Sequence, residues 1–318
     1  MIAALLAIAL GGGAVIALAA WAGLSAIGAE VWQAGWVIPP AVALMLIQLH
    51  LSAIAWRISI GGGPRLSRYF RVRWIREAVN SMLPVAQLGG NILAVRMLAS
   101  RGVPVPTATA GTTLDITIEV ATQLIFTMAG FAVLALTGPQ GAASWAAAII
   151  ALMAAVVAGF ILGQRIGLLR LVEALIRPLT RIFPGLTIET VRHLHAELLR
   201  LHRDRKALLQ AGALHFAAWL LGVLETWLTL WAMGIGTAFA PAFVIESLGM
   251  AARSAGFLVP GALGIQEGGL VVVAGLYAIP ADAAIALSMV KRARELAIGV
   301  AGLLMWQISA VRARIRRS

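Results

Sequence analysis

Long apolar stretches alternate with short polar or basic ones along almost the whole chain. A helix needs roughly 20 apolar residues to cross a hydrocarbon core of about 30 Å, and many of these stretches are that long. The pattern predicts six full spans, at about 2–24, 36–56, 108–136, 144–162, 208–233 and 283–310. The predicted fold class is therefore an all-α polytopic membrane protein, with residues 1–318 forming a single membrane domain.

Two further apolar segments are broken near their middle by proline and glycine. The first, 76–101, is interrupted from Pro84 to Gly90, and the second, 241–279, is interrupted from Pro260 to Gly269. Both are predicted to be re-entrant hairpins of two half-helices, which membranes tolerate only where the freed backbone is buried in protein or lines a wet cavity. If 241–258 spans the membrane by itself, 270–279 must also cross, and the count becomes eight spans.

The two broken segments belong to a predicted internal repeat. Pro84 and Pro260 lie 176 residues apart, and the same offset relates two further pairs: Pro104 with Pro280, and Glu119 with Glu295. Repeat A covers about 36–123 and repeat B about 212–299, in opposite membrane orientation. Paired interrupted segments point to a transport site near the bilayer midplane, so the two breaks should face each other or share a cavity.

Composition and charge support a membrane protein and give its orientation. The chain is 61% hydrophobic, 12% charged and free of cysteine, which excludes disulfides and thiolate metal sites. Of 25 basic residues, six lie in 57–76, nine in 165–206 and four in 312–317. This is the positive-inside pattern, so these regions and both termini are predicted to be cytoplasmic. The same pattern accounts for the net charge of +12 without nucleic-acid binding.

Connections without Lys or Arg are then predicted on the outer side, at 25–35, 137–141 and 234–240. On the inner side, 167–206 is the sizeable segment outside the membrane. Its apolar residues recur at helical spacing with interspersed arginines, which suits a helix lying on an anionic leaflet. A solvated cap over the bundle fits the pattern equally well.

Ionisable residues within the apolar segments are the functional candidates, because a charge at the centre of a membrane helix costs about 2.5 kcal/mol or more. Asp115 and Glu119 share one helix face and lack a cation on their own helix. Arginines of repeat B, namely Arg253, Arg292 and Arg294, are the predicted partners. The alternative is a static network of ion pairs that only holds the repeats together. His215, on an apolar helix, is interpreted as a hydrogen-bonded packing residue.

The broken segments add candidates of a different kind. A half-helix that begins at the midplane presents free amides and a positive dipole end to an anion. Glycines there would let a lipid headgroup approach the backbone, or would only permit close helix packing. The full set of predicted substrate-binding or coupling residues is Glu77, Asn80, Pro84, Gln87, Gly89, Gly90, Asp115, Glu119, Arg253, Pro260, Gly264, Gln266, Glu267, Arg292 and Glu295. We expect no cofactor and no metal.

Three stretches carry a family resemblance: REAVNSMLPVAQLGG from Arg76, TTLDITIEVATQ from Thr112 and LVPGALGIQEGG from Leu258. They resemble the flippase-like membrane family typified by the transmembrane region of lysylphosphatidylglycerol synthase, especially its hopanoid-cluster-associated members. The resemblance covers nearly the whole chain and implies a bacterial inner-membrane protein that moves or presents a lipid between leaflets. Its family-type positions are Glu77, Asn80, Pro84, Gly90, Pro260, Gly264 and Glu267. The aminoacyl-transfer domain of the synthase has no counterpart here, so we expect no enzymatic activity.

The function expected from the sequence is thus that of a lipid flippase or transporter for a polar-headgroup lipid, such as a hopanoid or a phospholipid. Membrane lipids are the expected partners, together with enzymes of lipid biosynthesis. A transporter of a small polar or ionic solute is the first alternative, and a non-transporting scaffold for a lipid-modifying enzyme is the second. A lipid route predicts a lateral opening toward the acyl chains, a solute route predicts a sealed cavity, and a scaffold predicts no polar cavity.

Overall fold

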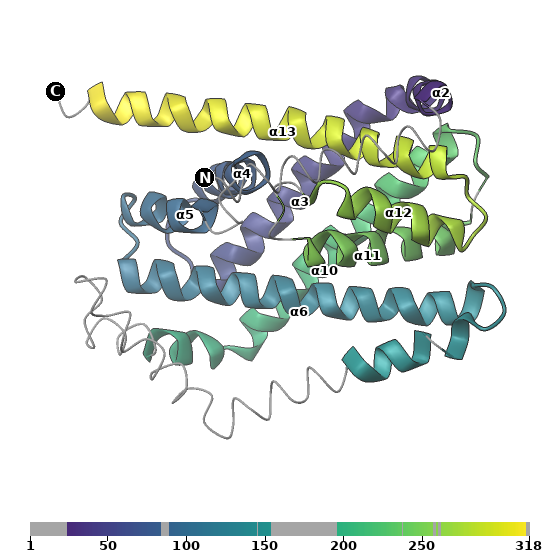
Figure 1. Ribbon diagram of the computed structural model, residues 1–318. Coiled ribbons are helices and arrows are strands. Elements are labelled where there is room, and N and C mark those ends of the chain that lie inside the picture. Colours follow the sequence, from purple (N-terminus) through teal and green to yellow (C-terminus); the bar gives the residue numbers. More distant parts are fainter. Residues whose placement is uncertain are drawn as a thin grey trace.

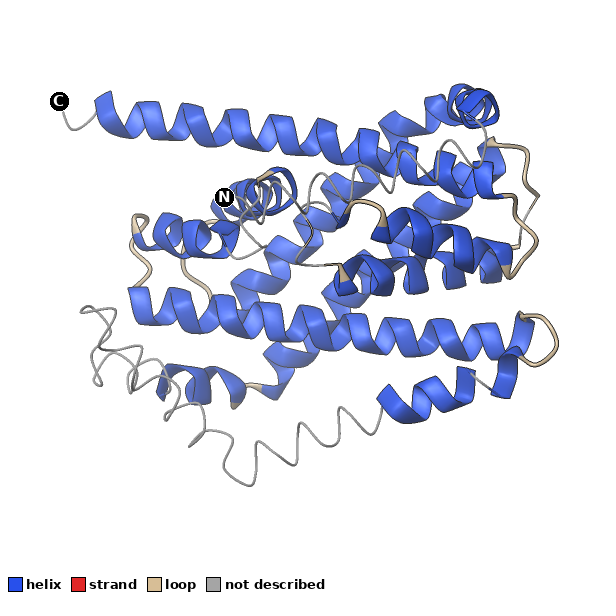
Figure 2. Cartoon of the chain, in the orientation of Figure 1, coloured by secondary structure: helices blue, strands red, loops and turns tan. Residues whose placement is uncertain are grey.

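The computed structural model describes residues 24–83, 89–144, 146–153, 196–236, 238–256, 259 and 262–315, and every regular element in these ranges is a helix (Figures 1 and 2). Three helical stretches are both long and apolar enough to cross a membrane: Ser25–Ser59, Val105–Thr137 and Arg205–Ala232. The all-helical membrane architecture expected from the sequence is supported at this level. Of the predicted spans at 2–24 and 144–162, the structure describes only residue 24 of the first and residues 144 and 146–153 of the second.

Two sets of four helices have the same order of long, short, short and long elements. In the first, α3 (Ile38–Ser59) is followed by α4 (Leu66–Met82, 17 residues), α5 (Gly89–Ala99, 11 residues) and α6 (Val105–Thr137). In the second, α10 (Arg205–Ala232) is followed by α11 (Phe239–Ala255, 17 residues), α12 (Ile265–Gly275, 11 residues) and α13 (Ala281–Ile315). We call these sets the first half and the second half.

Local sequence signals explain where several helices begin and end. Prolines occupy the first turns of α3 and α6, where no intrahelical donor is lost. The side chain of Asp204 caps α10 by accepting a 2.9 Å hydrogen bond from the Ala207 amide. After α3, the chain turns through Gly61, Gly62 and Gly63, which all have φ between +83° and +104°. A residue with a Cβ would be strained in this turn.

The halves pack against each other through matching pairs of helices: α3 with α10, α4 with α13, and α6 with α11. Within each half, the two short helices also pack together, α4 with α5 and α11 with α12. The helices α4 and α5 connect to their neighbours in the chain at one end of the bundle, and α11 and α12 connect to theirs at the opposite end (Figure 1). The short helices carry several of the functional candidates, among them Glu77, Arg253 and Glu267.

Basic side chains gather at the end of the bundle where α4 begins and α5 ends. A surface pocket of about 440 Å³ there is lined by the glycine turn, by Arg68, by Arg101 and by Arg200. Burial lowers the pKa of Arg101, and so do the like charges of Arg71 and Arg68. At the opposite end, Thr137 and Tyr277 share a 2.9 Å hydrogen bond between α6 and the chain just after α12. Basic segments distant in sequence thus meet at one end of the molecule.

Two boundary predictions are wrong. The stretch 25–35 was predicted to be a connection, but α2 (Leu24–Ala34) is a helix, since the stretch contains no proline and continues the apolar pattern that leads into α3. The first hairpin was predicted to begin at residue 76, but α4 begins at Leu66. The arginines of its first turns, such as Arg68 and Arg71, occupy the exposed face, while Tyr69 and Val72 are buried.

Candidate functional site: a charged cavity between the two halves

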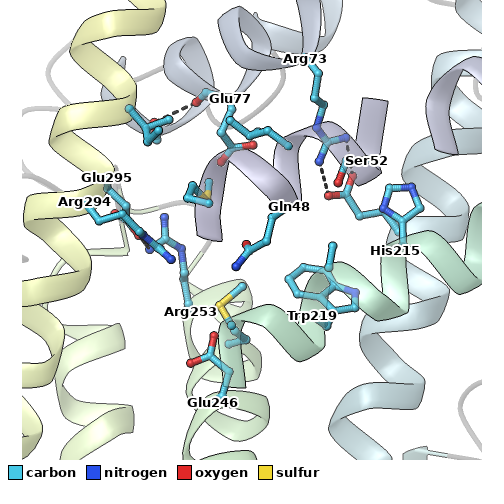
Figure 3. A pocket seen from close by; sticks show the side chains of 18 residues that line it. Gln48, Ser52, Arg73, Glu77, His215, Trp219, Glu246, Arg253, Arg294 and Glu295 are labelled. Atoms are coloured by element: carbon cyan, nitrogen blue, oxygen red, sulfur yellow. Dashed lines mark hydrogen bonds and ion pairs between the residues drawn. The ribbon is translucent and has the colours of Figure 1, made fainter. Parts of the chain in front are cut away.

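A polar cavity of about 130 Å³ lies between the two halves (Figure 3). One buried water requires only ~10–15 Å³, so the cavity can hold several waters or a small polar group. Its walls come from α3, α4 and α6 of the first half and from α10, α11 and α13 of the second. The polar lining consists of Gln48, Ser52, Arg73, Glu77, Ser81, Glu119, His215, Trp219, Glu246, Arg253, Arg294 and Glu295.

On the first-half wall, two arginines of α4 share two carboxylates of α6. Arg73 lies 2.5 Å from a Glu119 oxygen and 3.3 Å from Asp115, while Arg76 lies 3.0 Å from Asp115 and 3.3 Å from Glu119. Arg76 also stacks over the Trp56 ring at 5.6 Å, a cation–π contact. Arg73, Arg76 and Asp115 are buried, so the pairing offsets the cost of removing these charges from water.

The prediction that arginines of repeat B neutralise Asp115 and Glu119 is therefore wrong. The cations come from α4 in the same half, because the buried face of α4 carries Arg73 and Arg76 three residues apart. The second half contributes His215 of α10, whose Nε2 lies 3.0 Å from an Asp115 oxygen. His215 is buried and hydrogen-bonded as expected, and it connects the charged cluster to the other half.

On the second-half wall, Arg253 of α11 pairs with Glu295 of α13 and donates a 2.6 Å hydrogen bond to Gln266 of α12. Arg292 lies 3.0 Å from Glu267 and 3.5 Å from Glu295. These contacts join α11, α12 and α13 into one cluster. Five predicted residues, Arg253, Gln266, Glu267, Arg292 and Glu295, are brought together here.

Another layer of ion pairs lies against the second-half wall of the cavity. Lys291 lies 2.7 Å from Glu246, which also accepts a 2.5 Å hydrogen bond from Thr226. Arg294 pairs with Glu225 of α10. In this layer the cations of α13 neutralise carboxylates of α10 and α11.

Glu77 differs from the other charged side chains of the cavity. It stands on α4 between the two clusters, and within the described part of the chain its carboxylate makes no ion pair. Figure 3 shows this carboxylate directed into the space between the labelled side chains. Glu77 is thus the cavity carboxylate that is available to a ligand.

One hydrogen bond joins the two short helices of the first half, and another caps the start of α12 in the second half. Asn80 accepts a 2.9 Å hydrogen bond from the Gly90 amide at the start of α5, and Glu267 accepts a 2.7 Å bond from the Gly264 amide at the start of α12. A Cβ on Gly90 would lie 2.4 Å from the Arg76 carbonyl oxygen, and one on Gly269 would lie 2.5 Å from Ala252. At these positions the packing interpretation of the glycines is supported, and the two bonded amides are not free to bind an anion.

The predicted site residues thus fall into three groups. Glu77, Glu119, Arg253 and Glu295 line the cavity. Asn80, Gly89, Gly90, Asp115, Gly264, Gln266, Glu267 and Arg292 lie among the lining helices or support the lining residues. Pro84, Gln87 and Pro260 lie outside the described residues.

Several cavity residues were not predicted as site residues: Gln48, Ser52, Arg73, His215, Trp219, Glu246 and Arg294. Arg73 was counted with the cytoplasmic basic residues because its charge was considered without its position on the helix. The available signal was the spacing of Tyr69, Val72, Arg73 and Arg76, which places the two arginines on the apolar face of α4. Glu246 and Arg294 are ionisable residues within apolar segments, which is the sequence signal that could have placed them at the site.

An apolar helical bundle with a charged cavity between two similarly ordered halves defines an integral membrane protein. The family model described as "Lysylphosphatidylglycerol synthase TM region" matches residues 2–302, so the chain belongs to that family. No curated protein and no solved structure matches the chain.

Proposed function

We propose that this protein moves or presents a polar-headgroup lipid between the leaflets of the bacterial inner membrane. The observation that carries the proposal is the charged cavity between the two halves of an otherwise apolar bundle. Ionisable groups inside membrane proteins are costly and typically mark substrate or ion pathways. A chain of this family is related to lipid modification or transport, which favours a lipid as the substrate.

The arrangement of the helices supports an inverted repeat with two re-entrant hairpins. In each half the first short helix has 17 residues and the second has 11. The two pairs connect to the rest of the chain at opposite ends of the bundle. At 1.5 Å per residue, the short helices measure about 25 and 16 Å, less than the ~30 Å hydrocarbon core. Transporters built from inverted repeats bind substrate at the interface of the repeats, where this cavity lies.

In the proposed mechanism, the lipid headgroup enters the cavity while its hydrocarbon chains remain in the bilayer. Glu77 and Arg253 are the charged side chains that would contact the headgroup, since Glu77 lacks an ion-pair partner within the described residues and Arg253 lines the cavity. The carboxylates Glu77, Glu119, Glu267 and Glu295 would exchange protons or partners as the halves rock. This exchange would couple transport to a proton gradient. We assign no chemical reaction to the site.

The same cavity favours transport over a scaffold, because a scaffold requires no polar cavity. A transporter of a small polar solute is the second candidate, and the observation that favours it is the number of charged and polar side chains that line the cavity. The two transport functions differ in whether hydrocarbon chains must pass through the wall of the bundle.

The test is a leaflet-sidedness assay on purified protein in liposomes with a panel of head-labelled lipids. The wild type should accelerate loss of the label's leaflet asymmetry for at least one lipid, and Glu77→Gln should slow it about tenfold, the equivalent of ~1.4 kcal/mol. Glu197→Gln is the matched control, since Glu197 pairs with Arg200 at the basic end, away from the cavity. Uptake of a small solute without movement of any lipid would replace the lipid proposal with the solute alternative.

A further inference from the structure

An apolar groove of about 460 Å³ runs along the outer side of α6 and α11. The groove residues on α6 include Val120 and Leu124, which are 50% and 36% exposed. Ala251 and Ser254 of α11 and Met153 of the helix Ala142–Met153 complete its walls. The groove is therefore a mostly hydrocarbon-lined surface at the boundary between two helices from different halves.

The groove and the charged cavity adjoin along the α6–α11 boundary. On α6, Glu119 lines the cavity and Gln123, one turn later, lines the groove. On α11, Arg253 lines the cavity and the next residue, Ser254, lines the groove. On each of these two helices, neighbouring residues therefore line the ionic compartment and the apolar one.

The contact between α6 and α11 is closed by side chains at the level of the cavity. Gln123 Nε2 donates a 2.5 Å hydrogen bond to Ser254 Oγ and a 3.4 Å bond to the Met250 carbonyl oxygen. Two turns farther along α6 the packing is much tighter, since a Cβ on Gly130 would lie 1.9 Å from Ser247 Oγ. The boundary is thus held by a polar side-chain contact beside the cavity and by close packing beyond it.

The corresponding boundary on the other side of the molecule, between α4 and α13, has a different construction. Trp74 Nε1 donates a 2.8 Å hydrogen bond to the Ile298 carbonyl oxygen there. A Cβ on Gly299 would lie 2.6 Å from Met82, and one on Gly302 would lie 2.5 Å from Ala78. This boundary is closed by tight packing along the turns of α4 that follow Trp74, whereas the α6–α11 boundary is held beside the cavity by the side chains of Gln123 and Ser254.

We propose that the α6–α11 boundary is the lateral portal through which a lipid reaches the cavity. The occupant of the groove is the hydrocarbon chain of a membrane lipid whose ionic headgroup lies in the cavity, because the two compartments adjoin and match the two chemical parts of one lipid molecule. The Gln123–Ser254 hydrogen bond holds this portal closed, and we call it the latch. The inference rests on the proposed lipid transport and adds the route to it.

The test uses the absence of cysteine in the chain. Gln123→Cys and Ser254→Cys are combined, and the purified protein in liposomes is bridged with a short bis-methanethiosulfonate reagent, with free thiols counted by mass spectrometry. Bridging should slow translocation of head-labelled phospholipid at least tenfold, and reduction of the bridge should restore it. A long, flexible reagent of the same chemistry should leave most of the transport intact. Each single-cysteine variant treated with the short reagent is the matched control.

The outcomes separate the portal from the proposed function. If the double-cysteine variant still moves lipid at the wild-type rate after complete bridging with the short reagent, the portal is overturned and lipid transport stands. A wild type that moves no lipid would overturn the proposed function, and the portal with it. Equal inhibition by the short and the long reagent would mean that bulk in the groove, rather than closure of the boundary, stops transport, and it would also reject the latch.

Discussion

Arg73 and Arg76 of the first half and Arg253, Lys291, Arg292 and Arg294 of the second half all pair with carboxylates of their own half. Breaking one buried pair leaves an uncompensated charge, which typically costs about 3–5 kcal/mol. Each charged cluster therefore resists separation of its own helices. The interface between the halves carries fewer ionic contacts, and the bond between His215 and Asp115 is one of them.

A double-mutant cycle on Glu119 tests this assignment. Glu119→Gln should lower the free energy of unfolding by less than ~3–5 kcal/mol, because the Glu119 side chain is 22% exposed and Arg73 keeps its contact with Asp115. Combined with Arg73→Gln, the effects should be non-additive by more than ~0.5 kcal/mol, as expected for contacting residues. The measurement is thermal unfolding of the purified variants in detergent.

Arg253→Gln provides the comparison, since Arg253 lines the same cavity but pairs with Glu295. Its combination with Glu119→Gln should be additive within ~0.5 kcal/mol. Coupling to Arg253 rather than Arg73 would show that the first-half carboxylates are neutralised from the second half after all.

At the scale of elements, the two short helices of each half approach each other closely. The Gly90 amide binds Asn80, and the space where a side chain would stand is filled by the Arg76 carbonyl and by Asn80 itself. Arg76 is in turn held by Asp115, so the position of α5 and the first charged cluster are connected through α4. A change at Gly90 should therefore reach the cavity.

Gly90→Ala should destabilise the protein by roughly 1–3 kcal/mol, because the added methyl group overpacks the α4–α5 contact. Lipid translocation should fall with it, since the shift displaces Arg76 and its partners. Gly268→Ala is the matched control, because a Cβ at Gly268 meets nothing within 4 Å. Equal unfolding temperatures for the two variants would contradict the packing role assigned to Gly90.

Sequence patterns predicted helices such as α6 and α10 well, since an apolar run of sufficient length has few alternatives in a membrane. They also placed Glu77, Glu119, Arg253 and Glu295 at the site, because buried charge in an apolar segment is informative in itself. The partners of those charges could not be deduced, since pairing depends on which helices pack together. Counting arginines along the chain did not separate the exposed face of α4 from its buried face, so Arg73 and Arg76 were not recognised as buried.

At the scale of the molecule, the bundle has two chemically different ends. The start of α4, the start of α6 and Arg200 meet at the basic end. The end of α6 lies 33 residues away, or about 50 Å along the helix, where Thr137 contacts Tyr277. Arginines and lysines accumulate on the cytoplasmic side of membrane proteins. The basic end is therefore the end we propose to face the cytoplasm.

Single cysteines in this cysteine-free chain test that orientation in intact cells. Ser67, at the start of α4, and Gln140, after α6, are both exposed. The start of α4 belongs to the basic end, and the end of α6 lies at the opposite end. An impermeant thiol reagent should label Gln140→Cys from outside, since the connection after α6 leaves the membrane there. Ser67→Cys should react only after the membrane is permeabilised, and this second step also shows that its thiol is reactive. Labelling of Ser67→Cys in intact cells, with Gln140→Cys protected, would reverse the orientation and place the opening of the α4–α5 hairpin on the outer side.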